Sequence, residues 1–319
     1  MGIVLFEQQQ REIMMALSRR SFMQAGGTLA ALASLKAFAK VAYSQGDSVA
    51  RLIPPAGSVD CHMHIYDHHC PPAPTATLFP PDASLEDYRQ LQKRIGMSRM
   101  VIVTPSTYGT DNRILLDGLL RSRGDARGVA VVDGSISDQE LAELHDAGVR
   151  GIRFNMSVGN TALDDLERLA ARVDALGWNV QVAPGPFLVE IEQRLAKVPS
   201  RVVIDHMGHV PQPEGLKSEA FASLSRLMDN GKTWVKLSAP YLRSKVGEPT
   251  YDDAGQVGSA LISRTAERVL WGSDWPHPTL AADRKPDDAA LLDLLAVWAP
   301  EENKRILILR DNPVSLYGF

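Results

Sequence analysis

From about residue 57 onward, short runs of β-branched and other apolar residues alternate with segments whose apolar positions recur every three to four residues. Runs of the first kind are typical of buried parallel strands, and segments of the second kind are typical of amphipathic helices. In residues 161–176, leucine and valine recur on one face while Asp, Glu and Arg occupy the other. The pattern predicts eight strands, at 58–64, 99–105, 128–132, 149–155, 178–183, 201–206, 233–238 and 268–274.

Helix boundaries support this alternation. Ser137 and Glu140 have the spacing of a capping box, and Gly148 and Gly177 stand where helices are expected to end. Strands that alternate with helices form parallel βαβ units, and eight such units close into a barrel. A doubly wound sheet is the alternative, but no GxGxxG motif follows the first strand. We therefore predict an α/β fold with a single (β/α)8 TIM barrel over residues 57–319.

The first 44 residues have a different character. Ser18-Arg19-Arg20-Ser21-Phe22 resembles a twin-arginine export signal, and a small-residue apolar run leads to Ala37-Phe38-Ala39, a candidate A-x-A cleavage site. We expect a cleaved signal peptide at 1–44 and a linker at 45–56. The twin-arginine translocase would then be a partner, and the protein would be periplasmic. The apolar run is too short for a membrane span, and the alternative is an amphipathic N-terminal helix.

The overall composition argues against nucleic-acid binding and against a fold held together by disulfides. The chain has 319 residues, is 45% hydrophobic and carries a net charge of −4 without a basic block, which argues against nucleic acid as a partner. Its two cysteines, Cys61 and Cys70, imply no disulfide framework.

The first predicted strand ends in His62-Met63-His64. Side chains alternate along a strand, so we expect both imidazoles on one face and Cys61 and Met63 on the other. Such a pair can bind a metal, polarise a carbonyl or hold an anion.

In a (β/α)8 barrel the active site lies at the carboxyl ends of the strands, and here those ends collect polar side chains. We expect structural support from Asp205, a role at the rim or in substrate contact for Tyr108, and an exposed position for His145 on its helix. The candidate residues at the strand ends are His62, His64, Arg153, Asn155, His206, His209, Ser238, Tyr241, Arg243, Asp274 and His277.

Four motifs, VDCHMH, RGIRFN, VIDHMG and RVLWGSDWPHP, occur in this order between residues 59 and 278, within a resemblance that covers about residues 52–319. Together they resemble the amidohydrolase superfamily. The nearest branch is the amidohydrolase-2 group that contains 2-pyrone-4,6-dicarboxylate lactonase, 4-sulfomuconolactone hydrolase and D-galactarolactone isomerase. The resemblance implies that Asp274 activates water. It also implies that His62, His64 and His206 surround the scissile carbonyl, and that Arg153 and Arg243 hold an acidic group of the substrate. We add Asn155, Tyr108, Ser238 and His209 as substrate-binding candidates.

Most members of the superfamily bind Zn²⁺ or a related ion. The fifth strand here, Trp178-Asn179-Val180-Gln181-Val182-Ala183, offers no His, Lys, Glu or Asp ligand. We therefore expect no cofactor; a zinc ion, if one is bound, would be held by His62, His64 and Asp274. His209 stands where the dicarboxylate lactonase has an arginine, which favours a substrate with one acidic group.

These features predict a hydrolase that opens the lactone ring of a small anionic organic acid. Three alternatives stay open. The same site could isomerise a lactone, the chain could be a metal-dependent decarboxylase of the superfamily, or the barrel could be an exported solute-binding protein without catalytic activity.

Overall fold

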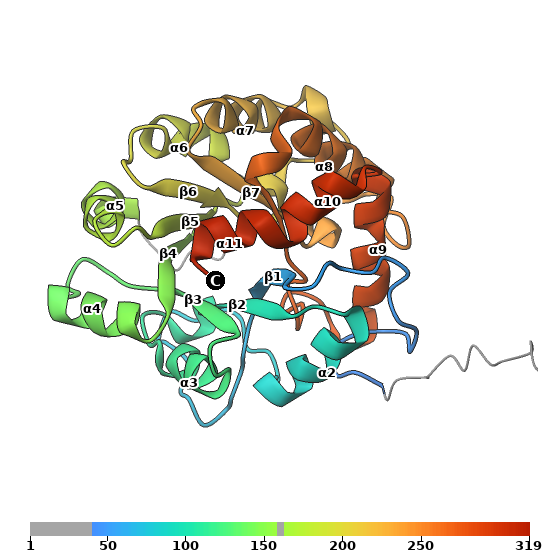
Figure 1. Ribbon diagram of the computed structural model, residues 1–319. Coiled ribbons are helices and arrows are strands. Elements are labelled where there is room, and N and C mark those ends of the chain that lie inside the picture. The colour runs from blue at the N-terminus through green and yellow to red at the C-terminus, as the bar shows by residue number, and fades with distance from the viewer. Residues whose placement is uncertain (1–39, 158–162) are drawn as a thin grey trace, which may run out of the picture. The chain divides into compact units, whose positions relative to one another are not determined.

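The computed structural model describes residues 40–157 and 163–319. Parallel strands form a ring with helices on its outer side (Figure 1). The strands pair in sequence order, each with the next. They are β1 Val59–Met63, β2 Arg99–Val103, β3 Ala126–Ala130, β4 Val149–Asn155, β5 Asn179–Ala183, β6 Arg201–Ile204, β7 Thr233–Leu237 and β8 Val269–Trp271.

The ring closes between β1 and the segment that follows β8. The Asp274 amide donates to the His62 carbonyl at 2.8 Å, and the His64 amide donates to the Trp275 carbonyl at 2.9 Å. A Cβ on Gly272 would lie 2.7 Å from the His62 Cβ, so only glycine allows this approach. All eight predicted strands are present, and the predicted barrel is confirmed.

The helices pack their apolar faces against the strands and share one large hydrophobic core with them. The predicted capping box of Ser137 and Glu140 is formed at the start of α4, and Gly148 and Gly177 have positive φ. The described helices of at least five residues are α2 Leu85–Ile95, α3 Arg113–Arg121, α4 Asp138–Asp146, α5 Leu166–Asp174, α6 Leu188–Leu195, α7 Glu219–Asp229, α8 Asp252–Thr265, α9 Asp288–Trp298, α10 Glu302–Ile306 and α11 Asn312–Tyr317.

A second, smaller core joins alternate strand positions with Leu316 and Tyr317 of α11, which crosses the middle of the ring in Figure 1. Cys61 belongs to this core, whereas Met63 belongs to the outer one. The expectation that Cys61 and Met63 share a face is therefore wrong, because the register of β1 shifts between Asp60 and Met63. Both cysteines are free.

Most of the expected signal peptide lies outside the described residues. Residues 40–44 are described, and Val41 and Ser44 are buried. Arg94 donates from Nη2 to the Ser44 hydroxyl at 2.9 Å and from Nη1 to the Gly46 carbonyl at 2.9 Å. The start of the expected linker and the residues just before it are therefore bound to the barrel. In the part of the chain that the structure describes, no helix is both long and apolar enough to cross a membrane.

Candidate active site

The carboxyl end of β1 and the loops after β6 and β8 bring three histidines and one aspartate together. The loops after β6 and β8 turn sharply, with φ of 51° at His206, 52° at His209 and 62° at Asp274. Residues other than glycine adopt this left-handed region at a cost of about 1–3 kcal/mol each, and such positions cluster at functional sites. Local strain here thus coincides with the residues that carry reactive side chains.

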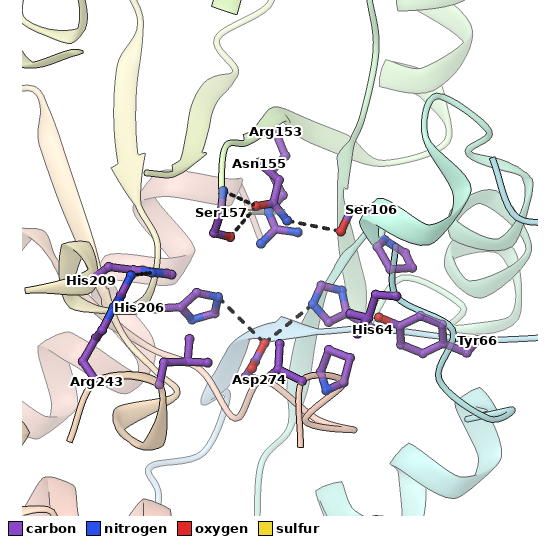
Figure 2. Close-up of a pocket in the computed structure, with 15 residues that line it drawn as sticks. His64, Tyr66, Ser106, Arg153, Asn155, Ser157, His206, His209, Arg243 and Asp274 are labelled. Carbon is purple, nitrogen blue, oxygen red and sulfur yellow. Dashed lines mark hydrogen bonds and ion pairs between the residues drawn. The ribbon is translucent and has the colours of Figure 1, made fainter. Parts of the chain in front are cut away.

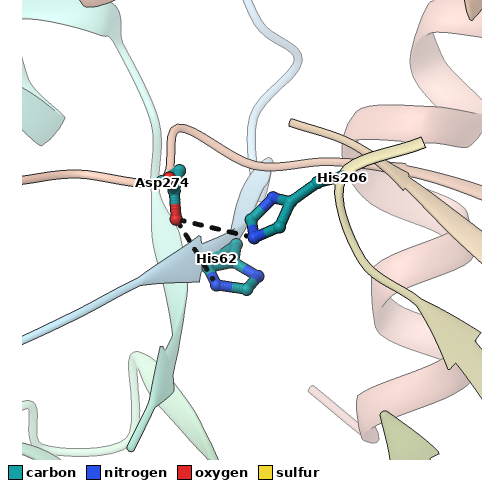
Figure 3. A group of neighbouring side chains, drawn as sticks. All are labelled: His62, His206 and Asp274. Atoms are coloured by element: carbon teal, nitrogen blue, oxygen red, sulfur yellow. Dashed lines mark ion pairs between the residues drawn. The ribbon is translucent and has the colours of Figure 1, made fainter. Parts of the chain in front are cut away.

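The imidazole Nε2 atoms converge on one carboxylate oxygen (Figure 3). Asp274 Oδ1 lies 3.6 Å from His62 Nε2, 3.6 Å from His64 Nε2 and 4.0 Å from His206 Nε2. The Nε2 atoms of His62 and His64 are 3.3 Å apart. The four side chains expected to carry the chemistry therefore form one cluster.

The other nitrogen of each imidazole has its own partner. His64 Nδ1 lies 2.8 Å from the Val103 carbonyl, which can only accept, so the hydrogen of a neutral His64 is on Nδ1 and its Nε2 has a free lone pair. His206 Nδ1 lies 2.8 Å from the Ser238 hydroxyl. His62 Nδ1 lies 3.3 Å from both Asp205 Oδ1 and Lys236 Nζ. These contacts orient the rings with Nε2 toward Asp274.

The cluster also fits a divalent cation. A tetrahedral Zn²⁺ with bonds of about 2.0–2.1 Å has ligand atoms about 3.4 Å apart. The separations within the cluster are similar, at 3.3 Å between the Nε2 atoms of His62 and His64 and 3.6–4.0 Å from the imidazoles to Asp274 Oδ1. His62, His206 and Asp274 offer three such atoms, and His64 adds a free lone pair. Nδ1 contacts of this kind are typical of metal-ligating histidines.

Asp274 is ionised in this setting. Burial alone would disfavour its charge, but His206 and His62 lower the pKa of the carboxyl well below its ordinary value. Burial lowers the pKa of His62 and His206 in turn. The site therefore combines a charged carboxylate with at least two neutral imidazoles.

A buried charged network lies beside the cluster. Asp205 Oδ2 accepts from Arg153 Nε at 3.1 Å and from Gln181 Nε2 at 3.0 Å. Lys236 Nζ lies 3.6 Å from Asp205 Oδ1 and donates to Gln181 Oε1 at 2.6 Å. Burial opposes the charge of Asp205, but His62, Lys236 and Arg153 outweigh it and hold the pKa of Asp205 well below its usual range.

A cavity of about 220 Å³ opens on the cluster (Figure 2). His64, His206 and Asp274 line it at one side, and Arg153 and Arg243 contribute positive charge. Asn155 donates to the Ser106 hydroxyl at 3.2 Å and accepts from the Ser157 hydroxyl at 2.6 Å. The expected residues that line the cavity are His64, Arg153, Asn155, His206, His209, Arg243 and Asp274.

Three expected residues lie elsewhere. His62 is fully buried behind the cavity wall. Ser238 contacts His206 Nδ1 and so orients that ring. The Tyr108 hydroxyl accepts from the Asp67 amide at 2.9 Å and anchors the loop after β1. His62 and Ser238 thus adjoin the cavity through the imidazole cluster, and Tyr108 has a position that suits the rim role expected as one of its two alternatives.

Sequence reasoning also missed residues of the site. Lys236 is fully buried on β7, and a lysine within the apolar run Trp234-Val235-Lys236-Leu237 was a signal that it needs an internal partner. Tyr66 and Ser106 line the cavity without belonging to any of the four motifs. His145 is half-buried, not exposed, because Trp178 Nε1 donates to its Nδ1 at 2.9 Å.

The sequence is similar to those of several known proteins. The chain is 39% identical to 2-pyrone-4,6-dicarboxylate hydrolase of Comamonas testosteroni over 277 residues. The match covers 82% of this chain and 90% of the relative. It is 35% identical to 4-sulfomuconolactone hydrolase of Rhizobium radiobacter, covering 83% of this chain and 91% of the relative. It is 31% identical to D-galactarolactone isomerase of Agrobacterium fabrum, covering 82% of this chain and 91% of the relative. The amidohydrolase family model matches residues 59–319. The chain therefore belongs to the amidohydrolase family, in the group that the four motifs indicate.

Proposed function

We propose that this protein is a hydrolase that opens the lactone ring of a small anionic organic acid. The observation that carries the proposal is the set of side chains that line the cavity. An ionised carboxylate and two imidazoles lie at one side, and two arginines line the same cavity. Two relatives named as lactone hydrolases and one named as a lactone isomerase support the same reaction class.

In this mechanism Asp274 Oδ1 removes a proton from water while His64 Nε2 accepts the other hydrogen and orients the molecule. The water oxygen attacks the lactone carbonyl. His206, which carries its hydrogen on Nε2 when Ser238 donates to Nδ1, donates to the oxyanion that develops. The ring C–O bond then breaks, and Asp274 returns its proton to the leaving ring oxygen. Lactone and water become a hydroxy acid, which releases one proton near neutral pH.

Arg243 is the side chain we assign to the acidic group of the substrate. Arg153 is paired with Asp205, whereas Arg243 forms no ion pair with a carboxylate among the described residues and contacts His209 Nδ1 at 3.4 Å. Burial, His206 and Arg243 lower the pKa of His209 to about 3, so this imidazole is neutral at physiological pH. One unpaired cation favours one anionic group on the substrate.

We propose that catalysis does not require a metal. Strand β5 contains no His, Lys, Glu or Asp, and its Gln181 side chain binds Asp205 and Lys236. When bound, a divalent cation held by His62, His64, His206 and Asp274 would polarise the carbonyl and acidify water. Purified protein should keep its activity after dialysis against a chelator. Loss of activity that returns with one equivalent of Zn²⁺ would refute this part of the proposal.

A panel of lactones tests the function. Neutral, monoanionic and dianionic lactones are assayed with a pH indicator, because hydrolysis releases a proton and isomerisation does not. We expect the highest kcat/KM for a monoanionic lactone. Faster turnover of neutral or dianionic lactones would contradict the assignment of Arg243.

Isomerisation is the second candidate, favoured by the relative named D-galactarolactone isomerase. Asp274 would then deprotonate a hydroxyl of the substrate, and that oxygen would attack the carbonyl in place of water. Product analysis by NMR separates the two reactions, since one gives an open-chain acid and the other an isomeric lactone.

We also propose twin-arginine export, with cleavage after Ala39 in place of the boundary after residue 44 that the sequence led us to expect. The motif at Arg19-Arg20 supports the route, and the burial of Val41 and Ser44 supports a mature chain that keeps them. Intact mass of protein from a periplasmic fraction tests both points: an N-terminus at Lys40 is expected, and an uncleaved cytoplasmic chain would refute them.

A further inference from the structure

The two oxygens of Asp274 have different surroundings. Oδ1 is the oxygen that faces His62, His64 and His206. Oδ2 accepts a hydrogen bond from the Tyr241 hydroxyl at 2.6 Å. Tyr241 follows β7 in the short turn Pro240–Leu242, so a segment that supplies no member of the imidazole cluster fixes the rotation of this carboxylate.

Tyr241 is itself held by a second contact. Its oxygen lies 3.0 Å from His277 Nδ1, and His277 Nε2 lies 3.2 Å from Asp288 Oδ2. Four side chains therefore form a continuous chain in the order Asp274, Tyr241, His277 and Asp288. His277 and Asp288 are fully buried, and the mechanism above uses neither of them.

The hydrogens along this chain can be placed by elimination. Asp274 is a carboxylate and only accepts, while burial and Asp274 raise the pKa of Tyr241, which keeps its hydrogen. Tyr241 has one hydrogen, which it donates to Asp274, so His277 Nδ1 must donate to the Tyr241 oxygen. One further proton lies between His277 Nε2 and Asp288 Oδ2, whichever of the two carries it.

The far end of the chain is fixed in the barrel. Lys285 Nζ donates to the His277 carbonyl at 2.7 Å, and the Asp288 amide donates to the Ser44 hydroxyl at 3.1 Å. Asp288 lies in the first turn of α9. Because the chain ends in this buried layer, it is suited to holding Asp274 in place and unsuited to carrying a proton to solvent.

We propose that Tyr241, oriented by His277 and Asp288, is the positioning residue that turns Asp274 so that Oδ1 is the base. This inference rests on the proposed function, since it assigns an orientation to the proposed base. Without the Tyr241 hydroxyl the carboxylate rotates, and the oxygen that must reach the water is no longer fixed. Misplacement of a catalytic group by about 1 Å can cost about 100-fold in rate.

Kinetics of Tyr241→Phe on the best lactone test the proposal. We expect kcat to fall roughly 10- to 100-fold while KM changes less than about threefold, because substrate contacts are retained. Tyr251→Phe is the matched control, since it also removes a tyrosine–carboxylate hydrogen bond, the one to Glu248 at 3.2 Å. It should stay within about twofold of wild type. Equal effects of the two variants would overturn the proposal.

Double variants separate positioning from general structural damage. In an Asp274→Asn background, Tyr241→Phe should change the residual rate by less than about twofold, because the group through which Tyr241 acts has been removed. His277→Asn, whose amide can replace the Nδ1 donor, should retain more kcat than His277→Ala. Independent, multiplicative losses in the double variant would refute the chain, as would His277→Asn and His277→Ala variants of equal kcat.

Crystal structures distinguish failure of this inference from failure of the proposed function. If wild type opens no lactone, the function fails, and the orientation of Asp274 in wild type and Tyr241→Phe still reports on positioning. We expect the carboxylate to rotate in Tyr241→Phe and to be unchanged in Tyr251→Phe. An unchanged Asp274 in Tyr241→Phe would overturn the inference on its own.

Discussion

Replacing Asp205 by Asn should destabilise the folded protein strongly, because this carboxylate balances two buried cations. Asp205 and Lys236 are fully buried and Arg153 is 4% exposed. Asp205 lies 3.1 Å from Arg153 Nε and 3.6 Å from Lys236 Nζ. Asn keeps the size of the side chain and part of its hydrogen bonding but removes the charge. The two cations would then be buried without a carboxylate partner.

Removing one partner of a buried ion pair costs about 3–5 kcal/mol. At about 2–4 °C for each kcal/mol in a domain of this size, the Tm of Asp205→Asn should fall by roughly 10 °C. Thermal unfolding at pH 7, followed by circular dichroism, measures this change. Arg153 would also lose its fixed orientation, so kcat/KM should fall in the same variant.

Asp229→Asn is the matched control, because it makes the same chemical change in an exposed ion pair with Arg264. Exposed pairs contribute about 0–1 kcal/mol, so this variant should melt within about 3 °C of wild type. A Tm for Asp205→Asn as close to wild type as that of Asp229→Asn would show that the buried network is not a major source of stability.

Three further predictions concern the site. Asp274→Asn should lower kcat roughly 10²- to 10⁴-fold in the pH-indicator assay without lowering the Tm, and activity close to wild type would exclude Asp274 as the base. Arg243→Gln should raise KM about 10- to 100-fold for anionic lactones but not for neutral ones, since a charged hydrogen bond contributes about 1.5–3 kcal/mol. The pKa of His209 is about 3 when folded and about 6.5 when unfolded. The unfolded chain therefore takes up the proton first as the pH falls, and stability decreases from pH 6.5 toward 3. His209→Asn should remove about 1.4 kcal/mol per pH unit of that slope in urea unfolding between pH 6 and 4, and an unchanged slope would contradict the neutral, buried imidazole.

The fold was predictable because its signal is local and repeated. Alternating apolar strands and amphipathic helices gave all eight strands, with ends within a few residues of those observed. The largest difference is at β8, which ends at Trp271 instead of Asp274. Gly272 passes close to His62, and Asp274 adopts a positive φ, so the chain leaves strand geometry at the residues that form the site.

The site was predictable only in part. Motifs at strand ends identified the cluster of His62, His64, His206 and Asp274, because the barrel brings those ends together. The supporting contacts could not be found in this way. The register shift in β1, which puts Cys61 and Met63 in different cores, has no signal in the sequence. Tyr241 reaches Asp274 through a turn that has no sequence periodicity.

The charge balance around the cavity supports the proposal that the substrate carries one acidic group. The sequence suggested this from the few cationic residues in the motifs, without Lys236, which adds a positive charge that Asp205 and Gln181 hold. His277 and Asp288 share one proton, so this pair is neutral in sum wherever the proton lies. The ionised groups that line the cavity or contact the His62 ring then carry one net positive charge before substrate binds. A monoanion neutralises that charge, whereas a dianion would leave a negative charge next to the base. The three cations counted are Arg153, Lys236 and Arg243, and the two anions are Asp205 and Asp274.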